Sequence, residues 1–415
     1  MKTKNILFLS NGHGEDTHNC QIIKAFIKIS SDTTISAMPI VGAGNSYKNL
    51  GIPIICPTAN MPSGGFFYLN PLLLFKDLRQ GLISLTWRQL QIVRQFAKNC
   101  DLVMATGDIV VAAIAYWTKL PYVVFLSADS SYYEGRINLG LILPKLLNNS
   151  RCLKVFVRDA LTATDLNRQG IKKAEFVGTP VMDNLISTGK DLQLKPGLFT
   201  IGILPGSRLP EADRNLSLLL KLVREIVKVM GENVCQFRVA AVPILISELE
   251  AFAENSAGIV TSENWQYQAG KLTFLTEEYS IEVICYEDAF ADILQQSNLV
   301  IGMAGTAIEQ AVGLGKPVIT IPGEGPSFTY RFAEAQTRLL GCSVQVIGKQ
   351  AANSFLLQEA AQKVKEILAD KEYLEACIRN GIQRMGRPGG SEKIADYLMQ
   401  YLILNTKKNA TENSL

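Results

Sequence analysis

The sequence predicts an α/β protein made of two doubly wound domains, each a parallel sheet covered by helices. Three observations support this prediction. Apolar strand-like runs alternate with helical patterns along the chain, which is typical of parallel sheets with helices on their faces. The length of 415 residues exceeds one ordinary core and fits two domains of about 200 residues. The opening pattern of strand, glycine loop and helix also recurs near the middle of the chain.

The first half of the chain is expected to begin with a strand and to alternate from there. Short apolar runs predict its strands, and longer amphipathic patterns predict its helices. The predicted strands are 6–10, 34–40, 52–56, 102–106 and 122–126, and the predicted helices begin at Thr17 and Ile109.

A polar stretch at 186–197, closed by Pro196-Gly197, interrupts the alternation and predicts a linker. Beyond it the pattern restarts with a strand at 199–204, the loop 205–208 and a long helix from about Glu211 to Met230. The expected boundaries are a first domain at 1–187, a second at 197–385, a closing helix at 391–404 and a frayed polar tail at 405–415.

Composition and charge exclude several functions. The net charge of +3, from 41 Lys plus Arg and 38 Asp plus Glu, provides no general field for nucleic acid. Eight scattered cysteines without a C-x-x-C pair, and only two histidines, indicate reduced thiols and no metal site. The first apolar run is too short for a signal peptide, and none reaches the ~20 residues of a spanning helix. We therefore expect a cytoplasmic protein, either soluble or peripherally bound to a membrane.

The segment 299–321 predicts a buried strand, a glycine turn, a short helix and a second buried strand. Small residues at Gly305 and Thr306 allow backbone N–H groups and the helix N-terminus to approach an anion closely, which suits a diphosphate. Glu309, one turn into the helix, cannot favour phosphate but can accept hydrogen bonds from a ribose. The turn therefore predicts a nucleotide-sugar site, and an ordinary βαβ unit is the alternative.

With these loops in view, the chain resembles the lipid A disaccharide synthases and, more loosely, other two-domain glycosyltransferases such as the peptidoglycan GlcNAc transferase. The most specific element is Leu204-Pro205-Gly206-Ser207-Arg208, which matches the family's L-P-G-S-R. The runs 178–183 and 391–398 resemble the family's G-H/T-P/T-x-x-D run and its closing helix. The spacing from Gly305 to Glu309 is one residue shorter than in the lipid A enzymes. It resembles that of the peptidoglycan transferase and the UDP-GlcNAc 2-epimerases.

The resemblance implies a GT-B fold: two facing Rossmann-like domains with the closing helix crossing back onto the first. It implies that the second domain holds a UDP-sugar and that the first receives the acceptor. A helix N-terminus and one guanidinium can neutralise a UDP leaving group without a metal, so no cofactor beyond the UDP-sugar co-substrate is expected. The implied donor-side residues are Gly206, Ser207 and Arg208 at the diphosphate, Gly305 and Thr306 at the turn, Glu309 at the ribose, Tyr286 near the nucleobase and Gly323 in a loop closing on the sugar.

Two of these residues have ordinary structural alternatives. Arg208 has a surface position at a helix start as its alternative, and Tyr286 would equally suit the core. In the segment 285–290, the fold usually meets the nucleobase through backbone groups. Phe328 and the run 330–332 favour packing over ligand contact.

An inverting transfer needs a base that takes the proton of the acceptor hydroxyl. Asp108 directly follows the predicted strand 102–106 and resembles an aspartate-bearing loop of the lipid A enzymes. His13 lies in a Gly-His-Gly loop and has a side-chain pKa suited to neutral pH. Asp16 is a third candidate, with an N-terminal helix cap as its alternative role. We expect Asp108 to be the base, with His13 as the alternative, and His18 to be a solvated helix residue.

The segment 61–96 combines aromatic and leucine side chains with positive charges, as an interfacial helix at an anionic membrane surface does. A core helix or a dimer interface is the alternative. The residues concerned are Phe66, Phe67, Leu72 to Phe75 and Trp87 on the apolar side, and Lys76, Arg79, Arg88 and Arg94 on the basic side.

These observations together predict an inverting hexosyltransferase. It would move a GlcNAc-type sugar from a UDP-sugar to a lipid-linked sugar acceptor at the cytoplasmic membrane face, as in lipid A biosynthesis. A UDP-GlcNAc 2-epimerase shares the implied fold and donor but needs several acid and base carboxylates and no lipid. A non-catalytic UDP-sugar-binding protein is the third possibility. The resemblance also makes a homodimer plausible.

Overall fold

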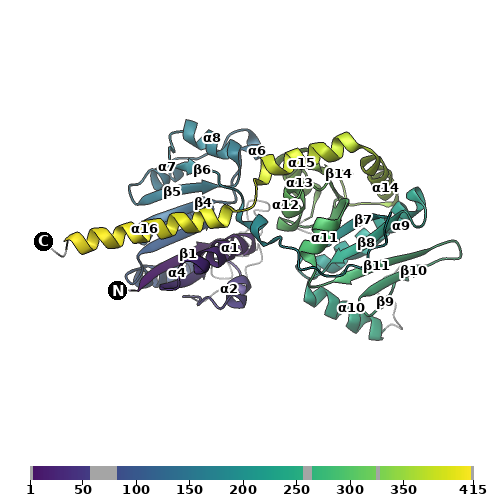
Figure 1. Ribbon diagram of the computed structural model, residues 1–415, viewed down its shortest axis with the longest axis horizontal. Coiled ribbons are helices and arrows are strands. Elements are labelled where there is room, and N and C mark those ends of the chain that lie inside the picture. The colour runs from purple at the N-terminus through teal and green to yellow at the C-terminus, as the bar shows by residue number, and fades with distance from the viewer. Residues whose placement is uncertain (1–2, 57–81, 256–263, 324–327, 413–415) are drawn as a thin grey trace. The chain divides into compact units, whose positions relative to one another are not determined.

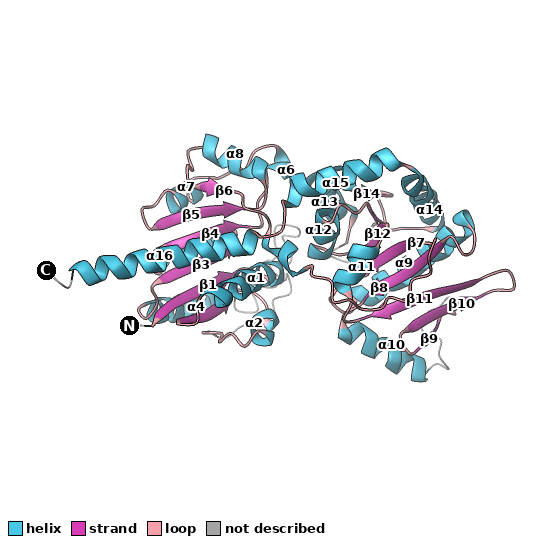
Figure 2. Ribbon diagram, viewed as in Figure 1, coloured by secondary structure: helices cyan, strands magenta, loops and turns pink. Residues whose placement is uncertain are grey.

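The computed structural model describes residues 3–56, 82–255, 264–323 and 328–412 (Figure 1). The chain divides into two compact units: unit 1 is Met1–Asp183 with Arg387–Leu415, and unit 2 is Asn184–Gly386. Each unit is built on one sheet with helices against it, which confirms the predicted α/β class (Figure 2). Within the described ranges, no helix has both the length and the apolar character needed to cross a membrane.

The described part of unit 1 contains a parallel sheet with the strand order β2-β1-β3-β4-β5-β6. Its central strands are buried on both faces, which explains their continuous apolar sequences. The strands are β1 (Lys4–Ser10), β2 (Thr33–Pro39), β3 (Leu102–Gly107), β4 (Tyr122–Leu126), β5 (Cys152–Val157) and β6 (Ala174–Glu175). The helices are α1 (His13–Ile29), α2 (Asn45–Asn49), α4 (Leu82–Ala97), α5 (Ile109–Trp117), α6 (Ser131–Glu134), α7 (Leu143–Leu147), α8 (Ala160–Arg168), the 3-10 helix η1 (Pro180–Asn184) and α16 (Gly390–Glu412).

Two local predictions for unit 1 were wrong. The predicted strand 52–56 forms only an isolated bridge between Ile54 and Ala37, because Pro53 has no N–H with which to continue a ladder. Helix α1 begins at His13 rather than Thr17, since the chain already turns at Gly12, which occupies the N-cap position with an extended backbone. As a result, Asp16 lies inside the helix.

Helices α1 and α16 cover one face of the unit 1 sheet, and α16 (yellow in Figure 1) lies over the strands, in roughly the same direction as they run. Ile22 and Phe26 of α1 pack with Ile394 and Leu398 of α16 over Phe8 of β1. Helices α4, α5 and α7 cover the opposite face. Because α16 continues to Glu412, the predicted frayed tail at 405–415 is helical as far as residue 412.

In unit 2 the described strands form one sheet in the order β14-β13-β12-β7-β8-β11-β10-β9, parallel from β14 to β11. Strand β10 pairs antiparallel with both β11 and β9. The strands are β7 (Phe199–Leu204), β8 (Cys235–Ala240), β9 (Gln266–Gln268), β10 (Lys271–Leu275), β11 (Ser280–Tyr286), β12 (Leu299–Gly302), β13 (Val318–Thr320) and β14 (Val344–Val346). The helices are α9 (Glu211–Met230), α10 (Pro243–Asn255), α11 (Phe290–Gln296), α12 (Thr306–Gly313), α13 (Tyr330–Leu340), the 3-10 helix η2 (Gly341–Ser343), α14 (Ser354–Ala369) and α15 (Lys371–Met385).

Candidate functional site

In unit 1, the strand order reverses between β1 and β3, so the loops after these strands start at neighbouring points of the same sheet edge. Asn11 follows β1 and Asp108 follows β3. The Asn11 amide nitrogen donates a hydrogen bond of 3.0 Å to Oδ2 of Asp108. Gly107 has a φ of +145°, and a Cβ at this residue would lie 3.1 Å from the Asn11 Cβ. In doubly wound sheets, this edge is where ligands bind.

Asp108 and Asp129 form an acidic pair at this edge. Asp108 accepts a hydrogen bond of 2.8 Å from the Val110 N–H, and burial raises the pKa of its carboxyl group despite this bond. Asp129 follows β4. Burial, and to a lesser extent the Asp108 carboxylate, raise its pKa to about 6, while Arg158 opposes the shift. Carboxyl groups with raised pKa values at a sheet edge are typical acid or base groups.

Neither Asp129 nor Arg158 was among the site residues predicted from the sequence. Both follow strands at the same edge of the sheet: Asp129 comes after β4, and Arg158 directly after β5. The Arg158 guanidinium is buried and donates a hydrogen bond of 3.0 Å to the Ser127 carbonyl oxygen, which holds the loop that carries Asp129. A polar residue just after an apolar run was the available signal for both.

Asp16 is fully buried beneath the loop that follows β1. Ser10 donates a hydrogen bond of 2.6 Å to its Oδ1, and its Oδ2 has no hydrogen-bond partner among the described residues. Burial raises its pKa to about 7. The alternative role of helix cap was wrong, since Gly12 occupies the N-cap position. Asp16 therefore supports the loop from inside the core and is not exposed towards a ligand.

The two histidines lie in very different surroundings. His13 is exposed, and its ring lies against Gly42, where an added Cβ would be 3.2 Å from the His13 Cε1. Gly42 comes after β2, so His13 also lies at the carboxyl edge of the sheet. His18, expected to be solvated, is instead buried, with its ring edge-on to Phe125 at 5.1 Å between centroids. Burial lowers the pKa of His18 to about 3.

In unit 2 the strand order reverses between β7 and β12, and the structure brings the two predicted glycine loops together there. Asn215 of α9 donates hydrogen bonds to the carbonyl oxygens of Pro205, at 2.9 Å, and Met303, at 3.4 Å. Gly206 has a φ of +103°, and a Cβ there would lie 3.2 Å from the Met303 oxygen. Gln336 holds the second loop through the carbonyl oxygens of Ala304 and Gly305. Hydrogen bonds therefore hold both loops at one edge of the sheet.

The remaining predicted donor-side residues of this edge differ in exposure. Ser207 and Arg208 are exposed at the end of the first loop, 205–208. Gly305 occupies the N-cap position of α12, whose half-buried first residue is Thr306, and Glu309 is half-buried one turn further. Gly323 is buried after β13, and a Cβ there would collide with the methyl group of Met303.

Tyr286 lies in the core of unit 2. Its side chain packs with Leu192, Ala289 and Ile293. Burial raises the pKa of its hydroxyl, and the nearby Arg238 guanidinium opposes that shift. The Tyr286 side chain therefore belongs to the core, which was the alternative to a nucleobase contact. The backbone of 285–289 lies at the end of β11.

Most of the predicted membrane-facing segment lies outside the described residues. This applies to Phe66, Phe67, Leu72 to Phe75, Lys76 and Arg79, and to the side chain of Trp87. Arg88 is exposed on α4, and the Arg94 guanidinium lies 5.4 Å from the ring centre of Trp117. Membrane contact by this segment stays a prediction.

Comparison with known proteins supports the resemblance inferred from the motifs. No family model matches the chain. A lipid-A-disaccharide synthase of Syntrophotalea carbinolica is 24% identical over 237 residues, which are 53% of this chain and 54% of that protein. The chain thus matches about half the length of this curated relative.

Solved structures match over nearly the whole chain. A spinosyn rhamnosyltransferase complexed with thymidine diphosphate has a TM-score of 0.58 at 13% identity and covers 95% of this chain and 99% of its own. The UDP-GlcNAc 2-epimerase of Neisseria meningitidis bound to UDP-GlcNAc has a TM-score of 0.54 at 13% identity, with coverages of 96% and 100%. The chain therefore has the GT-B fold that glycosyltransferases and UDP-GlcNAc 2-epimerases share, as the sequence predicted.

Proposed function

We propose that the protein is a UDP-sugar-dependent hexosyltransferase that moves a GlcNAc-type sugar to a lipid-linked sugar acceptor. The joined glycine loops of unit 2, held by Asn215 at the reversal of the strand order, carry this proposal. Glycine loops and a helix N-terminus suit a diphosphate, since they supply backbone N–H groups at close range. Support also comes from nucleotide-bound proteins of the same fold, one with thymidine diphosphate and one with UDP-GlcNAc.

The donor side would neutralise the leaving group with the protein's own charges. As the bond to the sugar breaks, negative charge grows on the β-phosphate. The exposed Arg208 guanidinium and the N-terminus of α12 can stabilise that charge. Glu309 would accept hydrogen bonds from the ribose. On this proposal no metal is required, and transfer should persist in excess EDTA.

On the acceptor side, Asp108 would act as the base in unit 1. Its carboxylate is oriented by the Asn11 amide and by the Val110 N–H. A raised pKa makes its ionised form a stronger base, which favours removal of a hydroxyl proton near neutral pH. His13 is the alternative base at the same sheet edge.

A lipid-linked acceptor is supported by the match to a lipid-A-disaccharide synthase and by the apolar, basic segment 61–96. The enzyme would then act on its acceptor at the cytoplasmic face of an anionic membrane. Replacing Phe66, Phe67 and Leu74 with serine should then reduce binding to anionic vesicles and leave UDP binding unchanged. If these residues belong to the core instead, the triple variant should unfold, because each such change costs about 2–5 kcal/mol in a core.

A UDP-GlcNAc 2-epimerase is the second candidate, and the acidic edge of unit 1 favours it. Inversion at a carbon that carries hydrogen needs groups that remove and return a proton. Asp108 and Asp129 have raised pKa values, and Glu15 stands near Gly107, where an added Cβ would lie 3.6 Å from the Glu15 Cγ. An epimerase needs such carboxylates and no lipid.

One assay separates these candidates. The purified protein is incubated with UDP-GlcNAc, with and without lipid-linked sugar acceptors, and the products are followed by NMR. Release of UDP that requires the acceptor supports the transferase, and formation of UDP-ManNAc without any acceptor supports the epimerase. Binding of UDP without turnover under either condition would indicate a non-catalytic binding protein. Failure to bind UDP or UDP-GlcNAc would overturn all three.

A further inference from the structure

The connector, defined here as residues 184–195, overlaps the predicted linker 186–197, yet it is bound along its length to unit 2. Its contacts reach helices α11 and α12 and strand β8. On the helices, Gln310 donates a hydrogen bond of 2.8 Å to the Asn184 side chain, and Gln295 donates one of 2.6 Å to the Leu185 carbonyl oxygen. On β8, Arg238 donates hydrogen bonds of 2.6 Å to the carbonyl oxygens of Leu192 and Gln193. The Lys195 N–H in turn donates a hydrogen bond of 2.9 Å to the Gln236 side chain.

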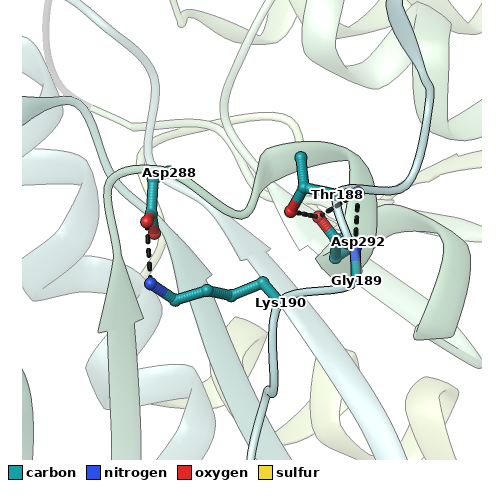
Figure 3. Close-up of polar contacts among 5 residues, drawn as sticks. All are labelled: Thr188, Gly189, Lys190, Asp288 and Asp292. Atoms are coloured by element: carbon teal, nitrogen blue, oxygen red, sulfur yellow. Dashed lines mark hydrogen bonds and ion pairs between the residues drawn. The ribbon is translucent and has the colours of Figure 1, made fainter.

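The connector also contacts Asp292 of α11, a fully buried residue whose carboxylate is drawn in Figure 3. It accepts hydrogen bonds from the Ser187 hydroxyl at 2.6 Å, the Thr188 N–H at 2.9 Å, the Thr188 hydroxyl at 2.8 Å and the Gly189 N–H at 3.0 Å. Burial alone would raise the pKa of Asp292, but these hydrogen bonds outweigh it and lower the pKa to about 2. The carboxylate therefore stays charged and holds three successive residues of the connector.

The connector also touches residues 285–289, which belong to the segment 285–290 that is expected to meet the nucleobase. Lys190 forms an exposed ion pair of 2.7 Å with Asp288, as Figure 3 shows. Leu192 packs with Tyr286 and Ala289 in one small buried cluster.

The connector also contacts helix α12, the second element of the proposed nucleotide site. Asn184 bonds to Gln310 of α12, the residue next to the proposed ribose ligand Glu309. One continuous stretch of chain thus contacts both elements that would hold the nucleoside.

We propose that the connector positions the segment 285–289 and helix α12 for a nucleoside diphosphate, with Asp292 as the main positioning residue. This inference rests on the proposed function and names a further part of the same donor site. Backbone groups can recognise a base only while the loop that carries them is fixed. A ligand that orders residues 285–289 should therefore also order the connector. By the same coupling, loosening the connector should lower the affinity for the ligand.

The test uses the full chain, with UDP and ADP as calorimetric probes. Asp292→Asn should lower UDP affinity by at least about tenfold and reduce the preference for UDP over ADP. A purely structural role would lower the melting temperature and leave that preference unchanged. In hydrogen exchange, UDP should slow exchange at Thr188 and Gly189 of the wild-type protein.

A matched pair of exposed variants covers the case in which Asp292→Asn does not fold. The Lys190→Glu variant places a negative charge beside Asp288, whereas Lys271→Glu places one beside Glu282, in a similarly exposed pair that links β10 to β11. The Lys190→Glu variant should bind UDP several-fold more weakly than the wild type. The Lys271→Glu variant should bind UDP with wild-type affinity. Equal UDP affinities, or exchange protection that stops at 285–289, would overturn the positioning role. Absence of UDP binding by the wild-type protein would instead overturn the proposed function.

Discussion

Asp183 accepts a hydrogen bond of 2.7 Å from the backbone N–H of Ser391, and a second of 2.6 Å from that of Gly389. The carboxylate thereby closes the N-terminus of α16, where backbone N–H groups lack partners within the helix and negative charge is favoured. Gly178 and Gly390 meet at the same point, since a Cβ on Gly390 would collide with the Gly178 carbonyl. The runs 178–183 and 391–398, far apart in sequence, thus form a single joint in unit 1.

Replacing Asp183 with alanine should therefore loosen α16. Two charge-assisted hydrogen bonds are lost, and we expect the free energy of unfolding to fall by about 1.5–3 kcal/mol. Chemical denaturation and hydrogen exchange of α16 measure the effect. Asp370→Ala is the matched control, since that residue caps α15 through one exposed bond to the Tyr373 N–H and should cost about 1 kcal/mol. A smaller loss at Asp183 than at Asp370 would contradict this role.

The fold was largely predictable because its strands are short, apolar and buried on both faces. The predicted strand 199–204 and helix 211–230 coincide with β7 and α9. Errors arose where one residue outweighed the pattern: Pro53 stopped a ladder, and Gly12 allowed α1 to begin a turn early. Neither effect changes local hydropathy, so an apolar pattern alone does not reveal it.

The candidate site was only partly predictable, because strand neighbours follow from the sheet order and not from local sequence. Loops after strands could be picked out, and Asp108 and Gly206 were found in this way. Asp129 joins Asp108 only because β3 and β4 are adjacent in the sheet. The burial of Asp16 and His18 depends on tertiary packing, since both lie on a helix whose polar residues look solvated in sequence.

Arg208→Ala tests the neutralisation of the leaving diphosphate. Loss of one preorganised positive charge should reduce turnover by about 100-fold, equivalent to about 3 kcal/mol of transition-state stabilisation. The side chain is exposed, so the melting temperature should hardly change. Arg214→Ala, an exposed arginine on α9, provides the control and should keep full turnover. Normal turnover in a folded Arg208→Ala protein would remove this residue from the mechanism.

Glu309→Ala tests the ribose contact. Hydrogen bonds to a charged group contribute about 1.5–3 kcal/mol, so UDP binding should weaken by that amount in calorimetry. Glu309→Gln retains one acceptor oxygen and should recover part of the affinity. Unchanged UDP affinity in the alanine variant would place the nucleoside elsewhere.

Asp108→Asn separates basicity from shape. The amide oxygen can still accept from the Asn11 side chain or the Val110 N–H, so donor binding should be retained. Transfer should fall by about 100-fold to 10,000-fold if the carboxylate removes the acceptor proton. His13→Gln is the companion variant. Should it produce that loss while Asp108→Asn does not, His13 becomes the base.

Asp16 should make unit 1 less stable as the pH rises. Its folded-state pKa of about 7 lies above its ordinary value of 3.8, so the folded protein holds an extra proton between these values. The stabilisation is complete below pH 3.8 and is lost as the pH rises through 7. At about 1.4 kcal/mol per pKa unit, the loss reaches about 4 to 5 kcal/mol at most.

Asp16→Asn carries no titrating proton at this position, so it should escape that loss. Urea denaturation of both proteins at pH 4 and pH 8 measures the difference in unfolding free energy. We expect the variant to gain stability relative to the wild type as the pH rises. Ser10→Ala should enlarge the loss of stability and extend it to higher pH, because the Ser10 hydroxyl favours the charged carboxylate through its 2.6 Å bond. Identical pH dependence in wild type and Asp16→Asn would show that this carboxyl group titrates alike in the folded and unfolded chain.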